Sequence, residues 1–224
     1  MIDDSHAAAF QKLRKIYVKQ AELRFDREFG DSAPPEKAAL LRSVVKAIED
    51  EAGLVRVHES GGHLVVRLGS EDDPRTPKIW TLASLNHEYV VQLAVLGRLL
   101  AILERAGHQG PDARRRLDAE YELADLVLFG DDGGASGRQA RTVLVQVEIK
   151  TGRSASAKEA RDATLVGTPI HTRWTKLKPR LLIFASGEDQ VIHLGRPNGD
   201  ALALPEQSTW DAIEGELIEI MRPA

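Results

Sequence analysis

The sequence contains no cysteine, and this absence excludes several kinds of site from these 224 residues. Without a thiol there is no disulfide, no zinc–thiolate centre and no cysteine nucleophile. The absence also agrees with a reducing compartment. The N-terminal segment is acidic and then basic, with no apolar core, and therefore does not resemble a secretory signal. We accordingly expect a cytoplasmic protein.

The sequence also lacks long apolar runs and an excess of positive charge. Its most apolar stretch, residues 89–103, is interrupted by Gln92 and Arg98 and is too short to span a bilayer comfortably. This stretch predicts a buried helix and no contact with a membrane. The formal net charge is −4, whereas nucleic-acid-binding domains are commonly basic. A surface for nucleic acid would therefore require a local concentration of basic residues.

The N-terminal part of the chain predicts two helices followed by a β-hairpin. Apolar residues recur at helical spacing over 6–29 and 36–52. Gly61-Gly62 lies between two β-branched runs, a sequence typical of a two-residue hairpin turn. Helix, helix and hairpin in this order would fit part of a winged helix, a fold that can bind duplex DNA.

A polar, proline-containing stretch at 69–78 resembles a linker. We therefore predict an N-terminal unit at 1–78 and a larger domain at 79–224. In the larger domain the patterns predict an α/β order of elements: a helix at 86–105, strands at 123–129 and 142–150, a helix at 155–166, strands at 180–185 and 190–194, and a helix at 210–221.

The strand at 142–150 contains the residues of greatest chemical interest. Because side chains alternate between the faces of a strand, one predicted face comprises Val143, Val145, Val147 and Ile149, and the other comprises Leu144, Gln146, Glu148 and Lys150. An edge strand with one solvated face would show the same alternation. Strong β-branching, and polar residues crowded at the C-terminal end, instead favour a central strand that ends at a ligand site.

Asp125 is the one charged residue in the apolar run at 123–129. A lone buried carboxylate is costly unless a cation or hydrogen-bond donors meet it. If the two strands pair antiparallel, Asp125 lies near Glu148, and a divalent cation would relieve the repulsion between them. Lys150, on the same side as Glu148, would stabilise charge on a phosphate, so the set suits phosphodiester hydrolysis. The alternative is a buried Asp–Lys pair that only joins two strands.

Asp125 followed by Glu148-Ile149-Lys150 resembles the signature of the PD-(D/E)XK, or restriction-endonuclease-like, nuclease superfamily. The resemblance covers about residues 85–195. It implies an α/β fold with a restriction-endonuclease-like core of helix, mixed β-sheet and helix. It also implies catalytic roles for Asp125, Glu148 and Lys150 in Mg²⁺- or Mn²⁺-dependent cleavage of DNA.

The same resemblance implies a metal site formed by Asp125, Glu148 and Glu88, since Glu88 corresponds to the glutamate that the family often has on the preceding helix. A glutamate in the first turn of a helix is also favourable through the helix dipole alone. Glu120 and Glu122 are substitutes close to Asp125 in the sequence. The chain departs from the family pattern in having Ala124 where proline is frequent, and some members of the family have lost catalysis.

Residues 163–187 include no acidic residue and could provide the local basic surface. Basic side chains with an interleaved aromatic suit a phosphate backbone and a stacked base. The predicted nucleic-acid-binding residues are Arg173, Trp174, Lys176, Lys178 and, on the preceding helix, Lys158. The alternative is a solvated loop with Trp174 in the core. Residues 114–116, three consecutive arginines, are a second basic candidate.

These features predict a divalent-metal-dependent endonuclease that hydrolyses DNA in defence or repair. One alternative is a catalytically idle, nuclease-like module that binds DNA or a protein. Another is a subunit that is active only within a larger complex, which would explain the acidic net charge. A homodimer is a further alternative, because a nuclease with a single site needs two copies to cleave both strands of a duplex.

Overall fold

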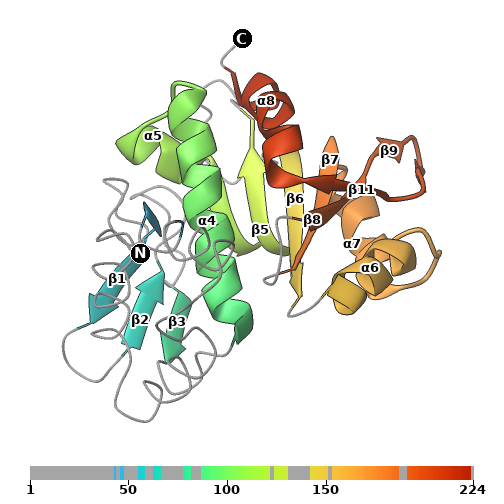
Figure 1. Cartoon of the computed structure of the whole chain (residues 1–224), viewed down its shortest axis with the longest axis horizontal. Coiled ribbons are helices and arrows are strands. Elements are labelled where there is room, and N and C mark those ends of the chain that lie inside the picture. The colour runs from blue at the N-terminus through green and yellow to red at the C-terminus, as the bar shows by residue number, and fades with distance from the viewer. Residues whose placement is uncertain are drawn as a thin grey trace, which may run out of the picture.

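The computed structural model describes residues 43, 46–47, 55–58, 63–66, 78–81, 87–121, 124–130, 142–150, 153–186 and 191–222. Within these residues the chain is an α/β protein with a mixed six-stranded sheet flanked by helices (Figure 1). The predicted helix at 6–29 lies outside the described residues. Of the predicted helix at 36–52, residues 43, 46 and 47 are described and are helical.

The six-stranded sheet has the strand order β11-β8-β7-β6-β5-β4. Its strands are β4 (Leu117–Tyr121), β5 (Ala124–Phe129), β6 (Val143–Lys150), β7 (Leu181–Ser186), β8 (Val191–Gly195) and β11 (Glu206–Thr209). Strands β6 and β7 run parallel, whereas the other neighbouring strands run antiparallel. A parallel pair needs a long crossover, and here it contains α6 (Arg153–Asp162) and α7 (Pro169–Leu177).

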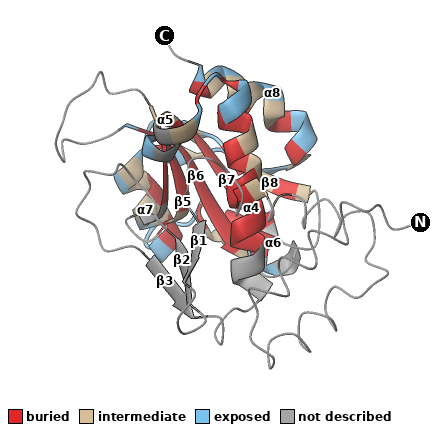
Figure 2. Cartoon of the chain, turned by 90° about the vertical axis from the view of Figure 1, so that its left-hand side faces the viewer, coloured by how far each residue is buried: buried red, intermediate tan, exposed pale blue. Residues whose placement is uncertain are grey.

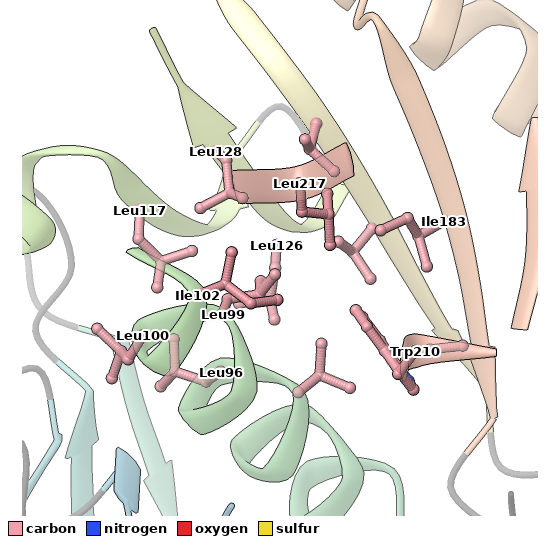
Figure 3. Packing of buried hydrophobic residues seen from close by; sticks show 14 of the residues in the cluster. Leu96, Leu99, Leu100, Ile102, Leu117, Leu126, Leu128, Ile183, Trp210 and Leu217 are labelled. Carbon is pink, nitrogen blue, oxygen red and sulfur yellow. The ribbon is translucent and has the colours of Figure 1, made fainter. Parts of the chain in front are cut away.

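One face of this sheet packs on α4 (His87–Arg105) and α8 (Trp210–Met221). The apolar residues between them form the main core, which Figure 3 shows with Leu96 and Leu99 of α4, Leu126 of β5 and Trp210 of α8. Figure 2 shows the central strands buried while α8 exposes its outer side. The short helix α5 (Gly110–Arg115) leads from α4 into β4.

The other face packs on α6 and α7 through a smaller core of Ala160, Ala163, Ile170, Trp174, Leu182 and Phe184. Successive residues of β7 alternate between the two cores, with Ile183 in the main core and Phe184 in the smaller one. Because Gln146 pairs with Leu182, and Glu148 with Phe184, both polar residues face the α6–α7 side.

A β-bulge interrupts β6. Leu128 pairs with Val145 but Phe129 pairs with Val143, so Leu144 is the extra residue. Leu144 consequently packs in the main core with Val145, whereas Val143 packs with Phe129 in a separate cluster. The predicted faces are therefore right from Val145 to Lys150 and wrong for Val143 and Leu144, because the bulge reverses the alternation.

The N-terminal residues form a second, three-stranded antiparallel sheet of β1 (Val55–His58), β2 (His63–Val66) and β3 (Lys78–Thr81). The first two strands confirm the predicted hairpin. The third extends the sheet through the predicted boundary after residue 78. No helix in the described part of the chain combines the length and apolar character needed to cross a membrane.

Ser43 lies directly against α4 at Gly97. A Cβ on Gly97 would lie 1.7 Å from the backbone oxygen of Ser43, so only glycine allows this approach. Ala47 is buried in the main core, and the Lys46 ammonium lies 2.8 Å from the Glu104 carboxylate. These contacts join the segment preceding β1 to the core of the larger domain.

The predicted helix at 86–105 and the antiparallel strands at 123–129 and 142–150 are confirmed as α4, β5 and β6. The predicted helix at 155–166 is shorter, because α6 ends at Asp162. The sequence patterns did not predict α5, β4, α7, β9 (Pro197–Asn198), β10 (Ala201–Leu202) or β11.

Candidate functional site

The candidate site lies at the C-terminal end of β6, where β5 begins. Leu126 pairs with Val147, so that Asp125 and Glu148 are the next residues along the two antiparallel strands. The Asp125 carboxylate accepts a hydrogen bond of 2.6 Å from the backbone N–H of Ile149. The structure thus confirms the predicted proximity of Asp125 and Glu148.

Glu148 is an almost completely buried carboxylate, with 1% of its side chain exposed. The Gln146 amide donates a hydrogen bond of 2.8 Å to its Oε1. Arg173 Nη1 of α7 donates to both carboxylate oxygens, at 2.9 Å to Oε1 and 2.7 Å to Oε2. These donors offset part of the cost of burying the carboxylate.

Burial, and after it the nearby Asp125 carboxylate, raises the pKa of Glu148 to about 8. The charges of Arg173 and Lys150 and the hydrogen bond from Gln146 lower this pKa, but each has a smaller effect than burial. A carboxyl group perturbed by burial and by a specific charged neighbour is a typical feature of a functional site.

Gln146 has an unsatisfied polar atom. Its side chain is fully buried, and its amide donates to Glu148, but its carbonyl oxygen Oε1 has no hydrogen-bond partner among the described residues. A buried acceptor without a donor costs free energy unless a water or a cation meets it. Gln146 Oε1 is therefore a buried acceptor that the described residues leave without a donor.

The helix α7 holds Arg173 over the end of β6. It begins at Thr168, whose hydroxyl accepts a hydrogen bond from the His171 N–H, and Pro169 follows at its first position. Ile170 and Trp174 bury one side of the helix in the smaller core. Arg173, next to Trp174, is thereby directed at Glu148 with 17% of its side chain exposed.

The predicted role of Trp174 as a base-stacking residue is wrong. Its side chain is 1% exposed, packs in the smaller core and donates a hydrogen bond of 2.8 Å to the Ala163 carbonyl. Its ring makes an edge contact with His171. The alternative that put Trp174 in the core is right, but the surrounding segment is the helix α7 and not a loop.

Lys150 is partly accessible at the edge of the site, with 29% of its side chain exposed. Its ammonium donates to the Ile149 carbonyl at 3.0 Å and lies 3.8 Å from the Glu159 carboxylate of α6. Solvent and solutes can therefore reach Lys150 beside the buried Glu148.

Gln92 of α4 is a positioning residue that the sequence patterns did not reveal. Its buried side chain donates a hydrogen bond of 3.0 Å to the Asp125 carbonyl. The signal in the sequence is a single amide within the apolar stretch at 89–97. This bond fixes the backbone of β5 at the candidate carboxylate.

The remaining predicted site residues are placed in different ways. Lys158 of α6, Lys176 of α7 and Lys178 at the end of α7 are exposed. Glu88 lies in the first turn of α4, but its side chain, like that of Glu120, lies outside the described residues, as does all of Glu122.

Of the three consecutive arginines, Arg115 is exposed and Arg116 is buried. Arg116 donates to Asp112, and Arg115 lies 3.7 Å from the same carboxylate. The side chain of Arg114 lies outside the described residues. Arg116 is therefore not part of an exposed basic surface that could bind nucleic acid.

The oxygen atoms at the site have the chemistry that a magnesium or manganese ion prefers. They are the carboxylates of Asp125 and Glu148 and the unsatisfied amide oxygen of Gln146. Among the described side chains, no group of three histidine, aspartate or glutamate residues is close enough together to hold a metal ion. The described residues therefore offer a metal ion two carboxylates and one amide oxygen.

No family model, curated protein or solved structure matches this chain. The function is therefore inferred from the site itself.

Proposed function

We propose that this protein is a divalent-metal-dependent nuclease with a restriction-endonuclease-like core, which hydrolyses phosphodiester bonds of DNA. The observation that carries the proposal is the pair of carboxylates at the adjoining ends of β5 and β6. Asp125 lies beside the buried Glu148, and Lys150 follows on the same face of β6. A buried carboxylate such as Glu148 is costly to keep in the interior.

The order of elements supports the proposal. A helix, α4, precedes the antiparallel pair of β5 and β6, and the helices α6 and α7 follow before the parallel strand β7. This is the order of helix, mixed sheet and helix that the sequence resemblance implies. A fold alone does not specify a function, so the proposal depends on the side chains at the strand ends.

The site residues have separable roles in this proposal. A divalent cation would supply Lewis-acid stabilisation of a phosphodiester under attack by water. Asp125 and Glu148 would hold the cation, with Gln146 Oε1 as a neutral oxygen ligand. The Lys150 ammonium would donate to a phosphate oxygen and stabilise the negative charge that develops on it.

A DNA backbone would meet the exposed lysines around this site. Lys158, Lys176 and Lys178 are exposed on the two helices that cover this face of the sheet. Their charges would provide sequence-independent contacts to phosphate. We retain them as the proposed nucleic-acid surface, in a pathway of defence or repair.

A catalytically idle nuclease-like module is the second candidate, and the salt bridge of Arg173 favours it. The Arg173 guanidinium occupies both oxygens of Glu148, as a permanent counter-ion would. In this case the chain binds DNA or a protein partner, alone or within a larger complex, and does not need a cation.

The test is incubation of the purified protein with supercoiled plasmid and with single-stranded DNA, in magnesium, in manganese and in chelator. We expect metal-dependent cleavage that Lys150→Ala lowers about 100- to 1,000-fold or more, because the variant loses a cation at the developing charge. Lys46→Ala is the matched control, since Lys46 pairs with Glu104 on the far side of α4.

Full activity of Lys150→Ala would end the proposed role of this lysine. If the wild-type protein binds DNA equally well in chelator and in metal, and never cleaves it, the protein is a catalytically idle binding module. Cleavage that requires a co-purifying protein would identify a subunit of a larger complex.

A further inference from the structure

We infer that Arg173 is a built-in competitor of the divalent cation: its salt bridge closes the site at Glu148, and a cation binds there only when the guanidinium leaves. This inference rests on the proposed metal site. Arg173 is not among the predicted metal ligands, and in this inference it regulates access of the cation to the metal site.

The position of Arg173 Nη1 carries the inference. This one nitrogen lies 2.9 Å from Oε1 and 2.7 Å from Oε2 of Glu148, and so takes a place between the two oxygens. A divalent cation held by the same two oxygens would need this place. The two positive groups cannot occupy it together.

A second donor reaches the same carboxylate. Oε1 also accepts the hydrogen bond from Gln146, and the side chain is buried. Gln146 Oε1, on the residue that donates to Glu148, is a buried oxygen without a hydrogen bond. The site therefore contains the oxygens for a cation, while the arginine provides the charge that a cation would provide.

Arg173 can leave without unfolding α7. The anchors of this helix in the smaller core are Ile170 and Trp174, and its first turn is capped by Thr168. Arg173 is partly exposed, and a long arginine side chain has many rotamers. Rotation of this one side chain would move the guanidinium out of the site.

The test compares Mn²⁺ binding, measured from the electron paramagnetic resonance signal of unbound Mn²⁺, in the wild-type protein and in Arg173→Gln. If the guanidinium closes the site most of the time, its removal strengthens Mn²⁺ binding about tenfold or more, because only the open fraction binds. Arg173→Lys, with a single ammonium in place of the planar group, should lie between the two. Arg105→Gln removes the same charge on the opposite side of the sheet, next to Glu214, and should leave binding unchanged.

The inference is overturned if Arg173→Gln, folded by circular dichroism, binds Mn²⁺ no more tightly than the wild-type protein. The proposed nuclease would survive that result, provided that both proteins bind the ion and cleave DNA. Absence of Mn²⁺ binding in both proteins overturns the inference and the proposed metal site together. Loss of the gained binding in Arg173→Gln/Glu148→Gln would identify Glu148 as the shared ligand.

A second measurement uses the wild-type protein alone. Phenylglyoxal modifies accessible guanidinium groups, and peptide mass spectrometry reports the rate at each arginine. Saturating Mn²⁺ should increase the rate at Arg173 severalfold and leave the rate at Arg105 unchanged. An unchanged or lower rate at Arg173 would overturn the inference.

Discussion

The two faces of the six-stranded sheet are both covered by helices but differ in what they bury. The face under α4 and α8 consists of leucines, isoleucines, valines and Trp210 (Figure 3). The face under α6 and α7 has a smaller apolar core and also buries Gln146, Glu148 and Ser156. The α4–α8 side also buries the polar side chains of Gln92 and His108, both hydrogen-bonded to backbone carbonyls, whereas the second face buries a carboxylate, that of Glu148.

The energetic difference between the faces indicates where function lies. Burying apolar area stabilises at about 25 cal/mol per Å². A buried ion pair such as Arg173 with Glu148 often contributes nothing relative to well-packed apolar residues, although removing one partner is costly. The polar groups under α7 are therefore the basis of the proposed metal site.

The largest loss of stability should come from the apolar face. Leu99 of α4 is fully buried in the main core, so Leu99→Ala should lower the free energy of unfolding by about 2–5 kcal/mol. Urea denaturation would measure the change. The control is Leu165→Ala, since Leu165 is exposed at the turn between α6 and α7 and should change stability by less than about 0.5 kcal/mol. Equal losses in the two variants would contradict the assignment of the core.

Another loss of stability should come from the contact of α4 with Ser43. Gly97→Ala places a Cβ 1.7 Å from the Ser43 backbone oxygen, so the helices must separate, at a cost of about 1–3 kcal/mol. Gly215→Ala is the matched control on α8, because its Cβ would meet no atom within 4 Å. That variant should stabilise by about 0.5–1 kcal/mol through helix propensity. A stabilising Gly97→Ala would show that Ser43 does not pack here.

Features with local periodicity could be predicted from the sequence, and features that depend on distant contacts could not. The helix at 86–105 and the paired strands predicted the neighbouring positions of Asp125 and Glu148. Arg173 meets Glu148 across 25 residues of chain, and no pattern near either residue indicates that pair. Within α7, however, Thr168-Pro169 is a helix-start signal that the basic composition of the segment had obscured.

Two other differences have equally specific causes. Trp174 is flanked by basic residues, which suggested a nucleic-acid surface, but its N–H is satisfied by the Ala163 carbonyl inside the core. The bulge at Leu144 adds one residue to β6, and strict alternation has no means of showing such an addition. In both cases tertiary packing decided which side of the element faces inward.

The sharpest contrast between the faces is expected for Glu148→Gln. Burial raises the pKa of Glu148 to about 8 in the folded protein, whereas the unfolded chain loses this proton near 4.5, so the charge of the Arg173 salt bridge develops as Glu148 ionises. The folded state therefore binds more protons in this window, and the stability that this group contributes falls as pH rises from 4.5 through about 8. Glutamine avoids this loss because it has no charge to bury.

Unfolding measured from pH 5 to pH 9 should thus give similar stabilities for Glu148→Gln and the wild-type protein at pH 5. At pH 9 the variant should be more stable, by at most a few kcal/mol, because each unit by which the folded-state pKa of Glu148 exceeds that of the unfolded chain is about 1.4 kcal/mol. If the variant is instead less stable at pH 9, the ion pair stabilises the fold. The polar groups under α7 would then need no ligand to explain them, and the idle module would become the better account of this face.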